Sequence, residues 1–242
     1  METCSEFTRP HHRRVEAVLR MLNAGRLHDL QCYFGGGTAI SLQLGEYRES
    51  IDIDFLCKSR GFHEIHRGVY LEGVRFLFSR APRLASETRR GRDAIRCAID
   101  LEDGGKPIKF EIIQEGYLQS LEAGDPVCGV TCLSKADSIA CKLMANADRG
   151  LDPAHQFRDF IDAAVASNAW KGEAPGGFEK AISAYGNDGS ILTAVEKVRS
   201  KLDTATLTAA GMALSIHPQK IAFIEEIISR GEPSPLPARA NP

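Results

Sequence analysis

The sequence predicts an α+β protein in two parts, with a mixed β-sheet flanked by helices followed by a helical C-terminal domain. Alternating apolar runs typical of strands occur only before about residue 115. The stretch 119–132 is rich in glycine and proline and is predicted to be a loop. Beyond it, apolar residues recur at helical spacing. We therefore expect domains at 1–123 and 124–230, and a flexible tail at 231–242 that contains four prolines.

The composition is that of an ordinary globular protein. The 242 residues are 43% hydrophobic and 26% charged, and the formal net charge is −2, so any basic surface must be local. Seven scattered cysteines are an odd number and favour reduced thiols in a cytoplasmic setting. There is no apolar signal core at the N-terminus and no run of about 18 apolar residues, so we expect no membrane partner.

Each element of the predicted fold has a local reason in the sequence. Pro10 suits the first turn of a helix at 9–24, whose apolar residues fall on one face. Runs of apolar and β-branched residues predict the strands, Asp103, Gly104 and Gly105 predict the turn of a hairpin, and helical periodicity predicts the helices. The expected elements are strands at 28–34, 51–56 and 74–78, a hairpin at 94–114, and helices at 39–44, 59–70, 134–149 and 154–168, with three or four more helices between 177 and 230.

Three glycines, Gly35, Gly36 and Gly37, stand between a predicted strand and a predicted helix. Thr38 is a natural N-cap for that helix. A tight strand-to-helix turn of this kind exposes backbone N–H groups at a helix N-terminus, where a phosphate can bind. On their own, the glycines are better explained by the turn itself than by phosphate binding.

Asp52 and Asp54 lie in an apolar run in the next predicted strand. Residues two apart in a strand point to the same face, so both carboxylates point the same way. Two neighbouring negative charges repel, and a divalent cation between them would remove the repulsion. The pair therefore predicts a metal site.

Glu111 is an acidic residue inside the second strand of the predicted hairpin, on the face that also carries Lys109. Acidic residues are poor strand formers and are seldom buried without a partner. Two explanations are open: Glu111 is a third ligand of the same metal, or it forms a salt bridge to Lys109 or to an arginine.

Six arginines are concentrated between residues 80 and 96, in a stretch that also contains Glu87 and Asp93. One interpretation is a solvated loop and strand edge. The other is a local basic patch that holds RNA phosphates or a nucleotide tail. The six are Arg80, Arg83, Arg89, Arg90, Arg92 and Arg96.

These parts together indicate a class of chemistry. A glycine turn that orients a triphosphate, paired aspartates and a third carboxylate are what metal-dependent nucleotidyl transfer requires. A dinucleotide-binding fold is the main structural rival, but Ile40 occupies the position of its third glycine and the strand signal does not continue in alternation with helices.

The run GGTAISLQLGEYRESIDIDF resembles the first motif of the nucleotidyltransferase-like AbiEii toxin family, within the polymerase β-type nucleotidyltransferase superfamily. The later segments LSKADSIACKLMANADRG and FRDFIDAA resemble the family's lysine-and-arginine helix and its Asp-x-x-Asp helix. The resemblance covers residues from about 30 to about 165. It implies a nucleotidyltransferase fold, with the helical domain forming one wall of the site.

The resemblance also implies roles for individual residues. Gly36, Gly37 and Thr38 would hold nucleotide phosphates. Asp52, Asp54 and Glu111 would bind Mg²⁺ or Mn²⁺, although many members of the superfamily have aspartate in place of glutamate at the third position. Lys142 and Arg149 would contact the nucleotide, and Asp159 would hold the lysine or complete the site. Lys135, Arg158 and Asp162 are secondary candidates.

The function implied is transfer of a nucleoside monophosphate from an NTP to a hydroxyl, most plausibly on RNA such as tRNA. Such an enzyme can be the toxin of a toxin–antitoxin or phage-defence system, with a cognate antitoxin as partner. The alternative is a catalytically silent module that keeps the fold and binds a nucleotide or a protein. The motifs do not identify the nucleotide or the acceptor.

Overall fold

The computed structural model describes residues 7–234, which form two compact units. Within this range, the first unit contains residues 7–46 and 50–134, and the second contains residues 47–49 and 135–234. The short segment Tyr47–Glu49 therefore belongs to the helical unit, although it lies between two elements of the sheet unit. The part of the expected tail at 235–242 lies outside the described residues.

The first unit is built on a mixed sheet whose strands run in the order β3-β5-β6-β2-β1-β8-β7, with β4 pairing to β5 beside this path. β2 is antiparallel to β1 and parallel to β6, while β5 is antiparallel to β6. The strands are β1 Cys32–Gly35, β2 Ile53–Cys57, β3 Arg83–Leu84, β4 Arg89–Arg90, β5 Ala94–Asp100, β6 Ile108–Gln114, β7 Ala123–Val127 and β8 Val130–Leu133.

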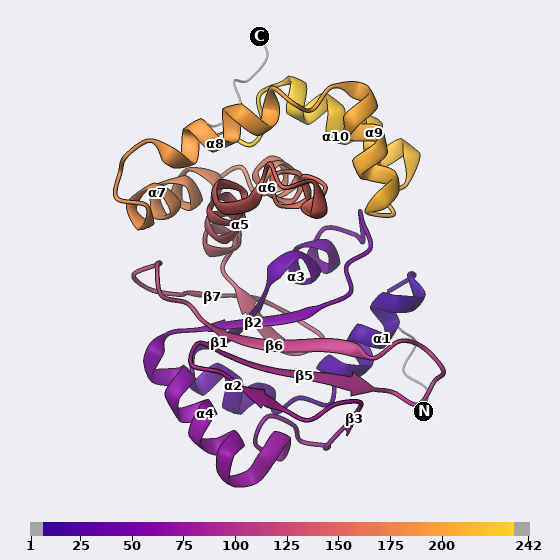
Figure 1. Cartoon of the computed structure of the whole chain (residues 1–242), viewed down its shortest axis with the longest axis vertical. Helices are drawn as coiled ribbons and strands as arrows, with labels where there is room; N and C mark the ends of the chain where they lie inside the picture. The colour runs from indigo at the N-terminus through magenta and orange to yellow at the C-terminus, as the bar shows by residue number, and fades with distance from the viewer. Residues whose placement is uncertain (1–6, 235–242) are drawn as a thin grey trace. The chain divides into compact units, whose positions relative to one another are not determined.

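The helices of the first unit lie on both sides of this sheet. α3 lies on one side, and α2 and α4 lie on the other (Figure 1). The helices are α1 Pro10–Leu19, α2 Ala24–Asp29, α3 Gly36–Gln43 and α4 Ser59–Glu72, with a 3₁₀ helix, η1, at Gly73–Phe76. The predicted mixed sheet flanked by helices is thus confirmed.

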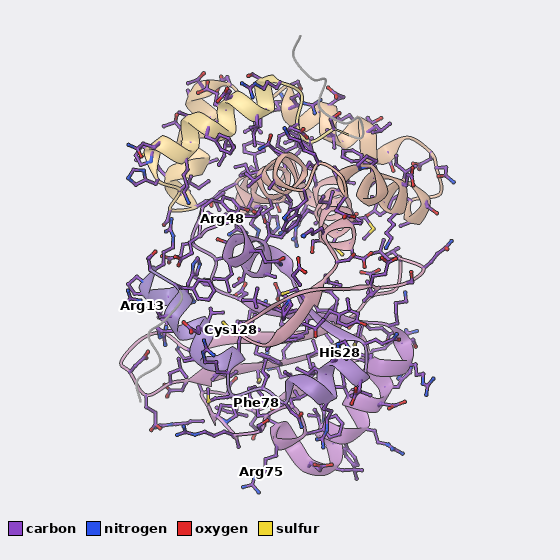
Figure 2. The ribbon with its side chains drawn as sticks, turned by 180° about the vertical axis from the view of Figure 1, so that it is seen from behind. Arg13, His28, Arg48, Arg75, Phe78 and Cys128 are labelled. Carbon is purple, nitrogen blue, oxygen red and sulfur yellow. The ribbon has the colours of Figure 1, made fainter. Side chains whose placement is uncertain are left out.

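The core of the first unit lies on one face of the sheet. Phe34, Phe55 and Phe110 come from adjacent strands, and each neighbouring pair of rings has centroids 5.6 Å apart. Phe78, labelled in Figure 2, packs on Phe110 at the same centroid distance. Because strand residues alternate between faces, burial of these rings leaves the opposite face to the intervening residues.

Several predicted elements differ from those observed. The expected strand at 74–78 is largely the 3₁₀ helix η1, because Val74 and Phe76 continue the turn that ends α4 rather than alternating across a sheet. The expected loop at 119–132 contains the hairpin β7–β8, whose irregular register accommodates its glycine and proline residues. The sheet unit therefore continues to Ser134, beyond the boundary expected at 123.

Two predicted helices have different limits. The helix expected at 9–24 ends at Leu19, and a second helix, α2, begins at Ala24 with the side chain of Asn23 as its cap. α2 occupies the first residues of the strand expected at 28–34, so β1 begins later, at Cys32. The helix expected at 154–168 begins later, at Arg158, after a 3₁₀ helix, η2, at Pro153–His155.

The second unit is helical, as predicted. α5 packs against α6, α7 and α8, and α10 packs against α6 and α9. Four helices follow α6, which agrees with the expected three or four. The helices are α5 Lys135–Arg149, α6 Arg158–Ala169, α7 Ala174–Ala184, α8 Ser190–Arg199, α9 Thr204–Ala213 and α10 Pro218–Ser229. In the range 7–234, every helix is too short or too polar to cross a lipid bilayer. The six cysteines in this range are all free of disulfide bonds.

Candidate active site

The glycine turn and Asp54 are in direct contact across β1 and β2. β1 ends at Gly35, which is the register partner of Asp54, and α3 begins at Gly36. Gly36 has a φ of +70°, and a Cβ placed there would lie 2.6 Å from Oδ2 of Asp54. Only glycine satisfies both conditions, because other residues rarely adopt this backbone conformation and have a Cβ that would displace the carboxylate. The turn therefore leaves Asp54 against backbone rather than against a side chain.

Thr38 connects α3 to the segment that carries Asp52. The predicted N-cap role of Thr38 is wrong: Gly35 is the N-cap, and Thr38 lies inside the helix. Its Oγ1 is 2.5 Å from the backbone carbonyl oxygen of Asp52 and 2.8 Å from Oγ of Ser50. Because the carbonyl oxygen can only accept, the threonine hydroxyl donates to Asp52 and can accept from Ser50. This hydroxyl therefore fixes the backbone at Asp52.

His12, which is buried, also hydrogen-bonds to the segment before Asp52. The backbone N–H of Ser50 donates to Nε2 of His12 at 3.2 Å, so Nδ1 carries the ring proton and donates to Glu46 at 2.9 Å. Burial lowers the pKa of His12 and keeps the ring neutral, against the opposing effect of Glu46. No motif in the sequence marked His12, because its partners lie 34 and 38 positions away along the chain.

Glu46 is the anchor of this histidine. It accepts hydrogen bonds from the backbone N–H groups of Thr8 and Arg9 and from the Thr8 hydroxyl. Burial alone would raise the pKa of Glu46, but these hydrogen bonds and the one from His12 lower it to about 2. Glu46 is therefore a stable carboxylate that positions a neutral histidine.

The third predicted carboxylate lies beside Asp54 in the sheet. Glu111 on β6 is the direct register partner of Asp54, so the two side chains leave the sheet on the same face. The row continues outward: Arg96 on β5 pairs with Glu111, and Arg89 on β4 pairs with Arg96. We call Asp54, Glu111, Arg96 and Arg89 the cross-strand row. It lies on the face opposite the phenylalanine core.

The carboxylate of Glu111 forms both of the salt bridges that the sequence left open. Arg96 Nε contacts Oε1, and Lys109 Nζ contacts Oε2. Burial would raise the pKa of Glu111, but Lys109 and Arg96 outweigh it and lower the pKa. In keeping with this pairing, no group of three or more His, Cys, Asp or Glu side chains within residues 7–234 is arranged around a common metal position. A metal role for Glu111 stays a prediction.

The helical unit contains a second group of charges, which we call the buried ion cluster: Arg48, Asp162, Lys142, Asp159 and Arg149. Its members alternate in sign. Lys142 Nζ lies 2.7 Å from Oδ2 of Asp162 and 2.8 Å from Oδ1 of Asp159. Arg149 Nε lies 2.8 Å from Oδ2 of Asp159. The predicted contact between Lys142 and Asp159 is therefore present, and both belong to a longer chain of ion pairs.

Arg48 closes the buried end of this cluster. Its guanidinium donates twice to Asp162, from Nε at 2.7 Å and from Nη2 at 2.8 Å, in the bidentate geometry that makes such pairs strong. The hydroxyl of Tyr47 also donates to Asp162. Arg48 is labelled in Figure 2. Tyr47 and Arg48 could not be predicted from the sequence, because they lie in a loop without periodicity. Both are part of the run that resembles the first family motif.

Burial and pairing act against each other in this cluster, and pairing prevails. Burial would lower the pKa of Lys142, but the carboxylates of Asp162 and Asp159 raise it. Burial would raise the pKa of Asp159, but Lys142 and Arg149 lower it. All five groups are therefore charged at neutral pH. The side chain of Arg149 is 41% exposed, whereas those of the other four are at most 9% exposed, so Arg149 is the outward end.

The predicted site residues thus fall into two sets. The first unit contains the glycine turn and the three carboxylates, and brings Gly36, Asp54 and Glu111 into one neighbourhood. The second unit contains Lys142, Arg149 and Asp159, which contact one another.

A glycine turn that opens a helix beside Asp54 on a mixed sheet is consistent with a nucleotidyltransferase. The chain belongs to the AbiEii family: residues 19–210 match the family model described as nucleotidyl transferase AbiEii toxin of a type IV toxin–antitoxin system. The family resemblance predicted from the motifs is therefore confirmed, and the match extends further in both directions than the range of about 30 to about 165 that the motifs covered.

Two solved structures are similar to the chain. One is described as that of a nucleotidyltransferase from H. pylori, with 18% sequence identity, coverage of 96% of this chain and 100% of that chain, and a TM-score of 0.41. The other is JHP933 from Helicobacter pylori, with 14% identity, coverage of 93% of this chain and 95% of that chain, and a TM-score of 0.40. No curated protein matches the chain significantly.

Proposed function

We propose that this protein transfers a nucleoside monophosphate from an NTP to a hydroxyl of an RNA acceptor, such as tRNA, with Mg²⁺ or Mn²⁺ held by Asp52 and Asp54. The observation that carries the proposal is the contact between Gly36 and Asp54. A Cβ at Gly36 would lie 2.6 Å from the Asp54 carboxylate, so this position of the turn must be glycine for the carboxylate to keep its place. A turn that served only to reverse the chain would not need this close approach.

The donor set fits a hard divalent cation. Asp54 lies in β2, Asp52 directly precedes this strand, and both residues are partly exposed. Mg²⁺ in nucleotide-handling sites is held by one or two carboxylates together with substrate phosphates and water, so a third protein carboxylate is not obligatory. When bound, the metal would neutralise charge on the phosphates during transfer. Glu111 would join this set only by exchanging its contacts with Arg96 and Lys109.

The nucleotide-binding roles follow from chemistry available in each unit. The N–H groups of Gly36 and Gly37 open α3, and N–H groups at a helix N-terminus favour an anion. The Thr38 hydroxyl is engaged by Asp52 and Ser50, so we assign Thr38 to positioning the backbone rather than to direct phosphate contact. We assign Arg149 and Lys142 to the triphosphate, Arg149 because its side chain is the exposed end of the buried ion cluster. Asp159 orients both cations.

As a member of a type IV toxin family, the protein would act in a cytoplasm beside a cognate antitoxin protein. Modification of an RNA acceptor would account for toxicity without a dedicated nuclease site. A catalytically silent module that binds a nucleotide or a protein remains the alternative. It predicts the same fold and the same nucleotide contacts but no need for the exact position of the Asp54 carboxylate.

The proposal is tested by incorporation of label into RNA. Purified protein is incubated with total RNA, Mg²⁺ and each of the four labelled NTPs in turn, beside the variants Asp54→Asn and Asp29→Asn. Asp29 is an exposed carboxylate on α2, so the two variants change charge equally within one unit. We expect one nucleotide to enter RNA with wild type and Asp29→Asn and none with Asp54→Asn. Equal cellular toxicity of wild type and Asp54→Asn, with no incorporation by either, would support the silent module instead.

A further inference from the structure

The outer part of the cross-strand row places two like charges directly opposite each other. Arg89 on β4 is the register partner of Arg96 on β5, and both side chains are exposed. Like charges directly opposite in a sheet destabilise the pair of strands. Among residues 7–234, no acidic side chain forms an ion pair with Arg89. An arrangement that costs stability and has no internal partner indicates a surface shaped for an anion.

The outer part of the row, beyond Asp54, together with Lys109 has more positive charge than the Glu111 carboxylate can neutralise. Glu111 is shared by Arg96 and Lys109, whose side chains are 50% and 51% exposed. With Arg89 added, three cations on β4, β5 and β6 have between them, among residues 7–234, the single carboxylate of Glu111 as ion-pair partner. Arg96 and Lys109 therefore share one carboxylate, and Arg89 adds a further positive charge beside them.

Two other arginines of the predicted patch are already occupied. Arg83 on β3 pairs with Glu102 and lies 3.6 Å from Asp100. Arg90, the neighbour of Arg89, leaves the sheet on the opposite face and lies over the ring of Tyr70, 4.7 Å from its centroid. The six arginines are thus not a uniform basic patch, and the structure separates Arg89 and Arg96 from their neighbours.

We propose that Arg89, Arg96 and Lys109 bind the phosphodiester backbone of the acceptor RNA as a single strand, and lead it toward Asp54. The inference rests on the proposed function, because it takes RNA as the acceptor. Adjacent strands are about 4.8 Å apart, so the row offers cations at regular intervals across β6, β5 and β4. A line of cations matches a chain of phosphates, whereas a single nucleotide would use a compact cluster.

The chemistry of the row favours RNA over an acidic protein. A protein interface has an apolar centre surrounded by a polar rim. Here the exposed side chains along the row are charged, and the residues beside Arg96 on the same face are Ala94 and Ala98. Backbone contacts from arginine and lysine carry no sequence preference, which suits a region that holds the acceptor at a distance from the reacting end.

The test is RNA binding measured without NTP or divalent metal. A fluorescein-labelled single-stranded oligoribonucleotide is titrated with wild type, Arg89→Ala and Arg83→Ala over a range of KCl concentrations, and anisotropy is recorded. The two variants lose the same charge from exposed arginines of the same sheet, but only Arg83 has acidic partners. For Arg89→Ala we expect the slope of log K against log salt to fall by about 0.7, which corresponds to about an eightfold weaker Kd near 50 mM salt. Arg83→Ala should match wild type.

Four results of this titration would overturn the assignment, and a separate measurement of NTP affinity gives a fifth. The four are absence of RNA binding by wild type, binding by Arg89→Ala equal to wild type, an equal loss in Arg83→Ala, and displacement of RNA by polyglutamate as effectively as by unlabelled RNA. The last result would assign the surface to an acidic protein. If Arg89→Ala loses affinity for free NTP instead, the row holds the nucleotide and the RNA assignment fails.

Failure of the proposed function gives a different pattern. If wild type incorporates no label but RNA binding depends on Arg89, the transfer reaction is wrong and the RNA surface stands. If wild type labels RNA while Arg89→Ala has an unchanged KM for RNA and unchanged binding, the reaction stands and the surface is wrong.

Discussion

The buried ion cluster of the helical unit and the cross-strand row of the sheet unit both contain arginine and acidic residues, but they differ in how completely their charges are neutralised. In the buried ion cluster, charges alternate, and Asp162 is saturated by Arg48, Lys142 and the Tyr47 hydroxyl. In the outer part of the cross-strand row, Arg89 faces Arg96, and these two arginines and Lys109 have between them, within the described range 7–234, one carboxylate partner, Glu111. The comparison indicates that the buried members of the first set are neutralised within the protein and only Arg149 reaches outward, whereas the outer arginines of the second set are left for a ligand.

The difference follows from burial. Removing one partner from a buried ion pair leaves an uncompensated charge in a low dielectric, so a buried group must be matched within the protein. Exposed charges are screened by water and salt, so an unmatched arginine on a strand surface is tolerated at small cost. Unmatched charge can therefore persist only where solvent or a ligand reaches it.

Within the buried ion cluster, substitution of Asp162 should cause the largest loss of stability. Asp162→Ala leaves Arg48 and Lys142 without their shared carboxylate, and we expect the free energy of unfolding to fall by about 3–5 kcal/mol. Glu226→Ala is the control, because it removes the exposed partner of Arg230 in the same unit and should cost at most about 0.5 kcal/mol. Denaturant titration measures both. Equal losses would show that the cluster contributes no more than a surface ion pair.

His12 and Glu46 hold the segment that carries Asp52, and the stability that they contribute should decrease in acid. Folding lowers the pKa of both His12 and Glu46, so the unfolded chain binds more protons and stability falls as the pH drops. The loss begins below the ordinary His12 value of 6.5 and continues through the range between 4.5 and about 2, where Glu46 titrates. The Glu46 part amounts to about 3 kcal/mol.

Denaturant titrations at a series of pH values measure this dependence, with Glu46→Gln beside the wild type. The variant should be less stable at neutral pH and should have a flatter profile in the lower range. A parallel profile would show that Glu46 does not contribute to the acid sensitivity.

The contact between Gly36 and Asp54 can be separated from backbone strain by a matched pair of glycines. Gly36 and Gly45 have φ values of +70° and +69°, but a Cβ at Gly45 has no heavy atom within 4 Å. Both alanine variants should lose about 1–2 kcal/mol of stability from the strained backbone. Only Gly36→Ala should also lose nucleotidyl transfer, by about a hundredfold, because it displaces the Asp54 carboxylate. Similar activity in the two variants would contradict the importance of this contact.

The smallest expected effect is at Thr38. Thr38→Val removes the hydrogen bond to the Asp52 carbonyl and should lower kcat about tenfold, while Thr38→Ser should restore it. Steady-state kinetics with RNA in excess measure the change. A rise in the KM for NTP with unchanged kcat would instead support the direct phosphate contact implied by the family resemblance.

The sequence predicted the parts of the fold that depend on short-range pattern. Alternation correctly placed Lys109 and Glu111 on one face of a strand. It also predicted that Asp52 and Asp54 share a strand face, but β2 begins at Ile53, so the common orientation of the two carboxylates stays a prediction. The sequence predicted the C-terminal helices because their apolar spacing is regular. The β7–β8 hairpin was missed because its glycine and proline residues are typical of loops, and only pairing of β8 with β1 makes it part of the sheet.

What the sequence did not predict depends on contacts between distant positions. Tyr47 and Arg48 reach Asp162 across more than a hundred positions, and His12 reaches Ser50 from the first helix. The arginines between residues 80 and 96 could not be sorted from spacing, because their differences arise from register: Arg89 faces Arg96, whereas Arg83 faces Asp100.

The central claim is that Asp52 and Asp54 hold a divalent metal with a nucleotide, and Mn²⁺ binding tests it most directly. The electron paramagnetic resonance signal of free Mn²⁺ is followed during titration with wild type, Asp54→Asn and Asp29→Asn in the presence of the NTP that labels RNA or, failing that, of each NTP. We expect wild type and Asp29→Asn to bind Mn²⁺ beyond what the NTP binds alone, and Asp54→Asn to lose this binding. Equal binding by all three proteins would contradict the account.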